Sequence, residues 1–417
     1  MKKLLLSIFA ISVSLLSFAN ITLNGVDYTI DTLSMYPAGP GTTYYELRFL
    51  RASDAKGRMD AFLLAVDTRN PYVHVEQALG TGKIIGTERP SNMAIRSTTE
   101  NKIFFAGSNG DFFVTQGDVG LPVSTTIVNK EYAHTPVANR TARRLGAIDA
   151  DGRGITAVQH SISMKLVLAD TTLNIAHANY KRLENELVLY NHLNGATTAT
   201  NAYGTEVQIQ LLEGEEWNTT GVMKAKVVKV EQLVGSMPLS AEYAVLSGHG
   251  TMAAELNKLQ AGDELTLDFE IKFDGELVNI AQAIGSDNYN QILHNGVIVQ
   301  DGFWNELHPR TGFGTSYTRD TVYMLVVDGR SINSAGCNTK VLGEMLKHYG
   351  AYNAVNWDGG GSSCLYVRNL GQMNNGSDGQ ERACGNGMFA VANVPEVDNT
   401  IAAIAPYMPI YSLPRSG

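Results

Sequence analysis

Two short segments decide the fold that we expect from this chain of 417 residues. They read Val327-Asp328-Gly329-Arg330 and Val355-Asn356-Trp357-Asp358-Gly359-Gly360-Gly361-Ser362-Ser363. Between them, apolar residues recur at helical spacing from a cap at Thr339 to Tyr349, ahead of Gly350. This order predicts a strand, a helix and a strand, with Asp-Gly following each strand. A parallel pair joined in this way would place both carboxylates at the same ligand-binding edge of a sheet.

Strand patterns elsewhere indicate a chain rich in β-structure. Apolar and polar residues alternate from Leu265 to Phe273, which predicts a half-buried antiparallel strand. Residues 322–327 are apolar at successive positions, as in a strand that is covered on both faces. We therefore expect an α+β fold with a mixed β-sheet core, packed helices, a β-rich middle section and a small N-terminal β region.

The first nineteen residues have the composition of a secretory signal peptide. Two lysines precede an apolar run from Leu4 to Phe18, and the pattern predicts cleavage before Asn20. This run is too short for a membrane span, and no later segment approaches the ~20 apolar residues that a spanning helix needs. We expect an exported protein, periplasmic or extracellular, without a membrane span.

The net charge limits the classes of partner that we expect, and the cysteine content limits the possible disulfides. Removing Lys2 and Lys3 with the signal peptide changes the formal net charge from −9 to −11, which argues against a nucleic-acid partner. An anionic substrate would need a local cluster of arginines. An exported chain permits one disulfide among its three cysteines, and the sequence leaves the pairing open. These cysteines are Cys337, Cys364 and Cys384.

Five local groups carry residues that could support chemistry. They are Asn109-Gly110-Asp111, His308-Pro309-Arg310-Thr311-Gly312, Asp328-Gly329-Arg330, Asp358 to Ser363, and Glu381-Arg382 with Asn386. In their order along the chain and in their residue types, these groups resemble the phosphodiester glycosidase family. That family is known for removing N-acetylglucosamine from a phosphodiester to uncover mannose 6-phosphate. The exported bacterial members look closer in pattern. The resemblance covers residues 80–395 and implies a catalytic domain there, with an accessory β region at 20–79 and a tail at 396–417.

The resemblance implies hydrolysis of the bond between a sugar anomeric carbon and a phosphodiester, which releases free sugar and a phosphomonoester. The partner would be a sugar-1-phosphodiester glycan or glycoconjugate. An oxocarbenium-like centre needs a carboxylate as nucleophile or base, and Asp358 or Asp328 is the candidate. The leaving phosphomonoester has a second pKa near ~6, so cationic stabilisation can largely replace a strong general acid. Arg310 is the candidate cation.

The remaining candidates are expected to bind substrate. They are Asn109, Asp111, Thr311, Arg330, Gly359, Gly360, Ser362, Ser363, Arg382 and Asn386. Each type also has a structural explanation, since aspartate before glycine caps turns, arginine forms ion pairs and glycine permits tight turns. Aspartate, asparagine and backbone carbonyls could also hold calcium or another divalent cation, so metal dependence stays open.

Two other functions are compatible with the same residues. A metal-dependent phosphodiesterase would cut the phosphorus-oxygen bond with acidic side chains arranged around a cation. A non-catalytic protein that binds cell-surface glycans could use the same fold with a site that has lost its activity. Oxygen-labelled water separates the two hydrolases, and binding without turnover would favour the third function.

Overall fold

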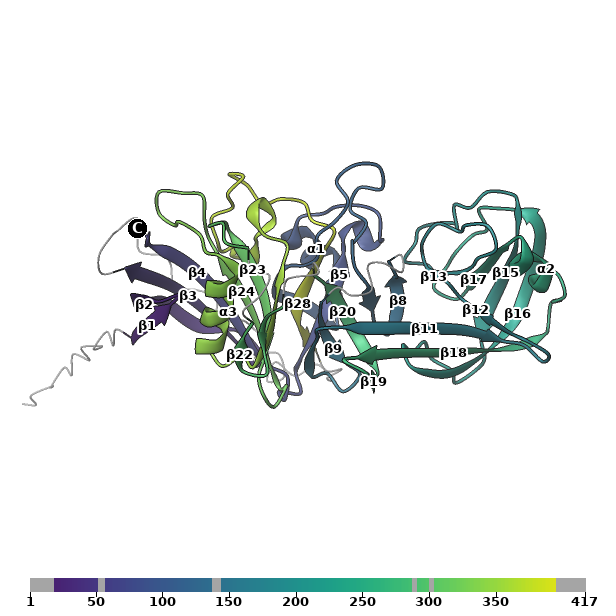
Figure 1. The fold of residues 1–417 in the computed structure, drawn as a ribbon, viewed down its shortest axis with the longest axis horizontal. Helices are drawn as coiled ribbons and strands as arrows, with labels where there is room; N and C mark the ends of the chain where they lie inside the picture. Colours follow the sequence, from purple (N-terminus) through teal and green to yellow (C-terminus); the bar gives the residue numbers. More distant parts are fainter. Residues whose placement is uncertain (1–18, 52–56, 137–143, 287–290, 300–303, 395–417) are drawn as a thin grey trace, which may run out of the picture.

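The computed structural model describes residues 19–51, 57–136, 144–286, 291–299 and 304–394. They form an elongated molecule with two β-rich parts (Figure 1). One part, the first lobe, contains the first and the last described strands. The other, the second lobe, is reached through the long strands β11 (His160–Val167) and β18 (Glu264–Phe273). Residues 1–18 of the predicted signal peptide and the predicted tail at 396–417 lie outside the described residues.

The expected α+β fold is wrong, because strands dominate the structure. About half of it lies in strands and 9% is helical. The described ranges contain three α-helices: α1 (Pro90–Ser97), α2 (Thr251–Leu256) and α3 (Thr339–His348). Curled antiparallel sheets cover most of the apolar strand faces. Periodicity in the sequence identified those faces, but it does not distinguish a covering helix from a covering sheet.

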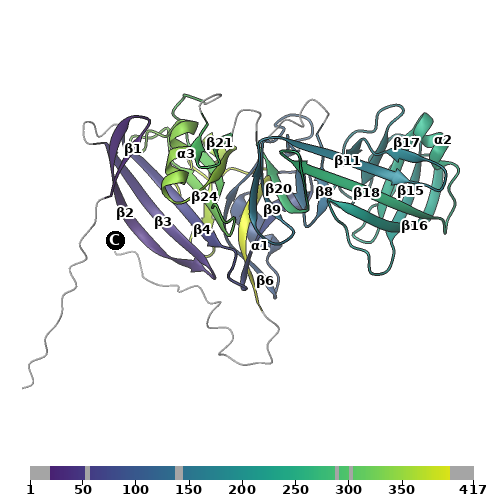
Figure 2. The same ribbon diagram turned by 60° about the horizontal axis from the view of Figure 1, so that its bottom comes forward.

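A nine-stranded sheet is the central layer of the first lobe. Its members are β1 (Ala19–Leu23), β2 (Val26–Gly39), β3 (Thr42–Arg51), β4 (Met59–Asp67), β21 (Gln291–His294), β22 (Val297–Ile298), β23 (Arg310–Thr315), β24 (Thr321–Val327) and β25 (Asn353–Trp357). They are ordered β1-β2-β3-β4-β24-β23-β25-β21-β22. The predicted accessory region at 20–79 thus supplies strands to this sheet, and β4 pairs with β24 (Figure 2).

A second sheet and a helix cover opposite faces of β24. The sheet contains β5 (Val73–Leu79), β6 (Lys102–Asn109), β26 (Leu365–Val367), β27 (Gly371–Gln372) and β28 (Asn386–Asn393). Met324 and Val326 share a core with Phe105 of β6. Leu325 points to the other face and shares a core with Leu342 of α3. The expectation that residues 322–327 are covered on both faces is confirmed.

The predicted strand, helix and strand at 322–357 are β24, α3 and β25. The helix cap is Asn338 rather than Thr339, because the Asn338 side chain accepts a hydrogen bond from the backbone N of Val341 at 2.9 Å. The two strands are not paired directly, since β23 lies between them and is antiparallel to both. They are therefore parallel to each other, and their carboxyl ends still meet at one edge of the sheet.

The second lobe has its own apolar core around Phe269. Its nine-stranded sheet joins β11 and β18 to β12 (Thr172–Asn174), β13 (His177–Ala178), β14 (Leu187–Tyr190), β15 (Gly204–Leu211), β16 (Gly221–Val234), β17 (Ala244–His249) and β19 (Glu276–Val278). Between the lobes lies a sheet of β7 (Thr126–Val128), β8 (Glu131–His134), β9 (Leu145–Asp149), β10 (Gly154–Ala157) and β20 (Ile280–Gly285). The alternating strand predicted at 265–273 is confirmed as β18. Over the described part of the chain, no helix has the length and apolar character needed to cross a membrane.

Candidate active site

Three neighbouring strands bring the candidate residues to one edge of the first lobe. Arg310, the first residue of β23, lies opposite the last residue of β24. Thr311 lies opposite the last residue of β25. Asp328 and Asp358 are the residues that follow β24 and β25. The antiparallel register therefore assembles at one edge four candidates that are up to 48 residues apart in the sequence.

The Asp358 carboxyl is partly buried in the loop that follows β25. The backbone N of Asp358 donates to the carbonyl of Gly110 at 2.9 Å, and its carbonyl accepts from Nδ2 of Asn109 at 2.8 Å. Burial raises the pKa of the carboxyl to about 6, against the hydrogen bond with Ser362 and the positive charge of Arg382. A carboxyl that titrates near neutral pH is suited to proton transfer or to attack in its ionised form.

The glycines after Asp358 allow two arginines to approach the backbone closely. Gly360 has a φ of +61°, in the left-handed region that favours glycine. A Cβ on Gly360 would lie 3.1 Å from Nη2 of Arg330. A Cβ on Gly361 would overlap the guanidinium of Arg382. Both explanations given for the glycines, a special turn and a close approach, therefore describe this loop.

Arg382 and Arg330 lie at the accessible rim of the loop. Arg382 forms an ion pair with Asp378 at 2.6 Å, and its Nη1 donates to Oγ of Ser362 at 3.3 Å. Its side chain is 41% exposed. Arg330 is exposed, and its Nε donates to Nδ1 of His308 at 3.3 Å. Both guanidinium groups pack on the loop that carries Asp358, and the charge of Arg382 acts directly on that carboxyl.

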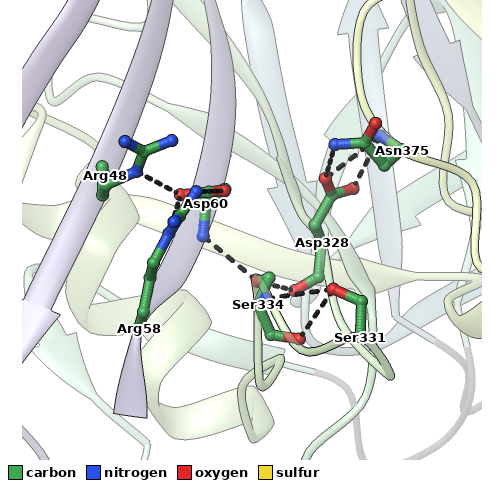
Figure 3. A network of polar contacts seen from close by, with 7 residues as sticks. All are labelled: Arg48, Arg58, Asp60, Asp328, Ser331, Ser334 and Asn375. Carbon is green, nitrogen blue, oxygen red and sulfur yellow. Dashed lines mark hydrogen bonds and ion pairs between the residues drawn. The ribbon is translucent and has the colours of Figure 1, made fainter. Parts of the chain in front are cut away.

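Asp328 is buried, and its carboxylate is occupied by hydrogen bonds (Figure 3). It accepts from Nδ2 of Asn374 at 3.1 Å, and from the backbone N and Nδ2 of Asn375 at 3.0 Å each. Its own backbone N donates to the carbonyl of Asp60 at 2.9 Å, and its carbonyl accepts from Oγ of Ser334 at 2.7 Å. Burial raises the pKa of this carboxyl, and the bonds from Asn375 and Asn374 oppose the rise. These contacts favour the structural explanation for Asp328.

Arg310 is also buried, with 3% of its surface exposed. Its Nε donates to the carbonyl of Cys337 at 3.2 Å, and its Nη2 donates to the carbonyl of Glu306 at 2.9 Å. The guanidinium lies over the Trp304 ring, 5.3 Å from the centroid, and that ring packs edge-on against Phe112 at 5.7 Å. Burial lowers the pKa of Arg310, although arginine stays charged at physiological pH. Arg310 therefore anchors residues 304–310 beside the edge.

Asn109, Thr311 and Ser363 form a buried frame beneath the Asp358 loop. Oδ1 of Asn109 accepts from Oγ1 of Thr311 at 2.9 Å and from the backbone N of Cys364 at 3.0 Å. Oγ1 of Thr311 is 3.2 Å from Oγ of Ser363. Because Asn109 also donates to the Asp358 carbonyl, one amide links β6, β23 and the loop after β25. These residues position the loop from below.

Asp111 and Asn386 connect the start of β28 with residues 111–124 behind the same edge. Oδ1 of Asn386 accepts from the backbone N of Asp111 at 2.8 Å, and the Asp111 carboxylate accepts from the backbone N of Ser124 at 3.0 Å. Both residues are buried. Gly359 packs against Pro309, whose carbonyl would lie 2.7 Å from a Cβ at position 359. The sequence-based candidates thus fall into an accessible group around Asp358 and a buried supporting group.

The three cysteines are buried and occur as free thiols. Sγ of Cys364 is 3.4 Å from Oε1 of Glu381, and Sγ of Cys384 is 3.8 Å from the carbonyl of Ser362. Burial raises the pKa of all three thiols, that of Cys337 to about 12. The disulfide that an exported chain permits is not formed in this structure.

The oxygen-rich group around Asp328 does not fit a cation. Asn374 and Asn375 direct N–H groups at the carboxylate, and these donors occupy the positions that a calcium ion would need. Within the ranges that the structure describes, no group of three or more His, Cys, Asp or Glu side chains is arranged to hold a metal ion.

Sequence reasoning did not select the partners of these candidates. Asp378 lies four residues before Arg382, and this spacing of opposite charges was the available signal. Asn374 and Asn375 are 46 and 47 residues from Asp328 in the chain, and no local pattern connects them. Trp304 was likewise not selected, although its ring contacts both Arg310 and Phe112.

A known protein family matches the part of the chain that contains most of the residues at this edge. The family model for phosphodiester glycosidases matches residues 220–391. The resemblance to this family is confirmed over that segment. It contains Arg310, Asp328, Asp358 and Arg382, whereas Asn109 lies outside it. No curated protein matches the chain.

Two solved structures, from Synechocystis and from Burkholderia pseudomallei, share the fold at low sequence identity. A hypothetical protein from Synechocystis has 15% identity and a TM-score of 0.60, with 85% of this chain covering 62% of that one, so this chain spans less than two thirds of it. An exported protein from Burkholderia pseudomallei K96243 has 17% identity and a TM-score of 0.62, with coverage of 90% and 99%. The zebrafish N-acetylglucosamine-1-phosphodiester alpha-N-acetylglucosaminidase catalytic domain, auto-inhibited by its pro-peptide, has 13% identity and a TM-score of 0.41, with coverage of 89% and 88%.

Proposed function

We propose that this protein is an exported glycosidase that hydrolyses the bond between a sugar anomeric carbon and a phosphodiester, releasing free sugar and a phosphomonoester. The observation that carries the proposal is the position of Asp358. It opens the glycine loop on which Arg382 packs, and burial raises the pKa of its carboxyl. The candidate residues at 109–386 all fall within the predicted catalytic segment at 80–395.

In this proposal Asp358 acts at the anomeric carbon. Its carboxylate either attacks the sugar or activates water, and both roles require the ionised form. Burial raises the pKa of Asp358 to about 6, so the group is mostly ionised above that pH and remains basic. Asp328 is assigned a positioning role instead, because its oxygens already accept hydrogen bonds from Asn374 and Asn375.

Arg330 and Arg382 are proposed to bind the phosphodiester. Their guanidinium groups lie against Gly360 and Gly361, on the same loop as the proposed nucleophile or base. Arginine binds two phosphate oxygens at once and stabilises the charge that develops on the departing phosphate. Arg310, proposed from the sequence for this role, is instead assigned to anchoring through Cys337 and Glu306.

The bond that is cut can be identified with oxygen-18 water. We expect purified protein incubated with methyl diesters of sugar-1-phosphates to release free sugar that carries the label, since water would attack the anomeric carbon. Label in the phosphate would refute this proposal and indicate a phosphodiesterase. Binding of the diesters without turnover would indicate a glycan-binding protein. Glucose-, mannose- and N-acetylglucosamine-1-phosphate diesters should be compared, since the sugar is unassigned.

Export is part of the same proposal. The N-terminal composition predicts a signal peptide at 1–19, and the Burkholderia protein of similar fold is named as exported. The expected location is the periplasm or the extracellular medium. N-terminal sequencing of the protein recovered outside the cytoplasm should begin at Asn20, whereas a protein that retains Met1 inside the cell would contradict export.

A further inference from the structure

A cavity of about 630 Å³ lies between the lobes. It is bounded in the first lobe by residues 84–85, 118 and 121, and in the second by residues 179–183, 190 and 194–201. We call it the interlobe cavity. None of the candidate active-site residues lines it. Its size is within the ~300–1,000 Å³ typical of small-molecule sites.

The floor of the interlobe cavity contains a buried polar network. Nη1 of Arg182 donates to Oγ of Ser247 at 2.7 Å, and Ser247 donates to Oε1 of Glu206 at 2.9 Å. Glu206 also accepts from the hydroxyls of Thr198 at 2.8 Å and Thr200 at 2.6 Å. Arg182, Thr198 and Thr200 line the cavity. One positive and one negative charge balance within this network.

Arg182 is buried beside the cavity and has one N–H group that is unpaired within the described ranges. The residue is 9% exposed, and its Nε, although buried, has no hydrogen-bond partner among the described residues. Burial lowers the pKa of Arg182, and the charge of Glu206 opposes that shift. A buried donor without a partner costs free energy, so this network is less than fully satisfied beside the cavity.

The rim of the interlobe cavity is apolar and aromatic. Ile85 is 44% exposed and Leu183 is 56% exposed, so both offer apolar surface at the rim. The ring of Tyr180 is held against the rings of His134 and His177 at 5.6 and 5.2 Å. Lys181 and Asp118 lie 4.0 Å apart across the opening, so the charges at the rim also balance.

We propose that the interlobe cavity binds an uncharged oligosaccharide. A sugar ring presents hydroxyls at its edge and C–H groups on its faces, which matches the threonine hydroxyls and the side-chain amides of Asn179, Asn194 and Asn201 that line the cavity below a rim of apolar and aromatic side chains. The two balanced charge pairs give an anion no net attraction, and they argue against an acidic glycan. The proposal is independent of the hydrolytic activity, because none of the proposed catalytic or substrate-binding residues lines the cavity.

The test is binding of chitotetraose, cellotetraose and maltotetraose, measured by calorimetry with tetragalacturonic acid as the charged comparison. We expect at least one uncharged probe to bind, and Ala196→Trp to weaken it by about tenfold or more. Ala196 lines the cavity and is exposed, so tryptophan would fill the space without removing a side-chain hydrogen bond. Ala261→Trp, at an exposed turn that does not line the cavity, is the matched control and should leave binding unchanged.

Three results would overturn the proposal. They are no binding of any uncharged probe, equal binding to the Ala196→Trp and wild-type proteins, and binding of the acidic probe alone. Raising the salt concentration to ~0.5 M separates the two chemistries, since it screens an anion site and leaves a neutral sugar site nearly unaffected. The uncharged probes contain no phosphodiester, so loss of the proposed hydrolase function would not affect this experiment.

Discussion

Replacing Asp358 by asparagine should abolish activity and stabilise the fold at the same time. Burial raises the pKa of Asp358 from 3.8 to about 6, a difference of about 2 pH units. Each unit corresponds to 1.36 kcal/mol, so the ionised carboxylate destabilises the folded protein by about 3 kcal/mol above pH 6. Asparagine has the same shape and can still accept a hydrogen bond from Ser362, but it carries no charge.

The sign of the pH effect follows from the same shift. In the wild-type protein, stability is lost as the pH rises from 3.8 to about 6, because the unfolded chain releases its proton first. The free energy of unfolding of Asp358→Asn should exceed that of the wild type by about 2–3 kcal/mol at ~pH 8, and by under ~1 kcal/mol at ~pH 4. Loss of the charged group should lower kcat by about 1,000-fold or more.

Urea unfolding at both pH values and release of free sugar at ~pH 8 measure the two effects. Asp170→Asn is the control, since Asp170 is exposed and should change neither quantity. A turn-capping role for Asp358 predicts the opposite outcome, with reduced stability and activity in proportion to the folded fraction. An active Asp358→Asn protein would refute the proposed assignment directly.

Asp328→Ala should destabilise the fold by about 2–4 kcal/mol, because it leaves the donors of Asn374 and Asn375 buried without an acceptor. Urea unfolding checks this, and a loss of activity at unchanged stability would instead assign Asp328 to chemistry. Gly361→Ala should raise KM by about tenfold, because its Cβ would displace the Arg382 guanidinium; steady-state kinetics with unchanged KM would contradict that phosphate contact. The cysteine thiols should react slowly with a thiol reagent in the native protein, since all three are buried and burial raises their pKa, and three thiols should react in urea. Only one reactive thiol in urea would mean that a disulfide had formed.

Local patterns predicted the elements that depend on neighbouring residues. The alternation in β18 and the helix α3 follow from side-chain periodicity, and both occur close to the expected positions. The common edge for Asp328 and Asp358 was also predicted, although β23 separates the two strands. The α+β class was wrong because the layer that packs on Met324 and Val326 comes from distant strands, which periodicity does not identify.

The roles of the candidate residues depended on distant partners. Arg310 and Arg382 look alike in sequence, yet one is 3% exposed and binds backbone carbonyls, whereas the side chain of the other is 41% exposed. Asp328 and Asp358 both precede glycine, but only Asp328 meets an asparagine pair almost fifty residues away. Residue type therefore indicated the chemistry. Long-range contacts decided which of the two arginines, and which of the two aspartates, is available for it.

The pairing of β4 with β24 has a practical consequence for dissecting this protein. A fragment that begins at residue 80, where the family resemblance begins, would lack β1 to β5 and leave one edge of β24 unpaired, since β23 still covers the other. β24 is apolar from Val322 to Val327, and an open apolar strand edge recruits strands from other molecules. The N-terminal strands therefore protect the edge of β24 from pairing with other molecules. The fragment that resembles the family should aggregate without them.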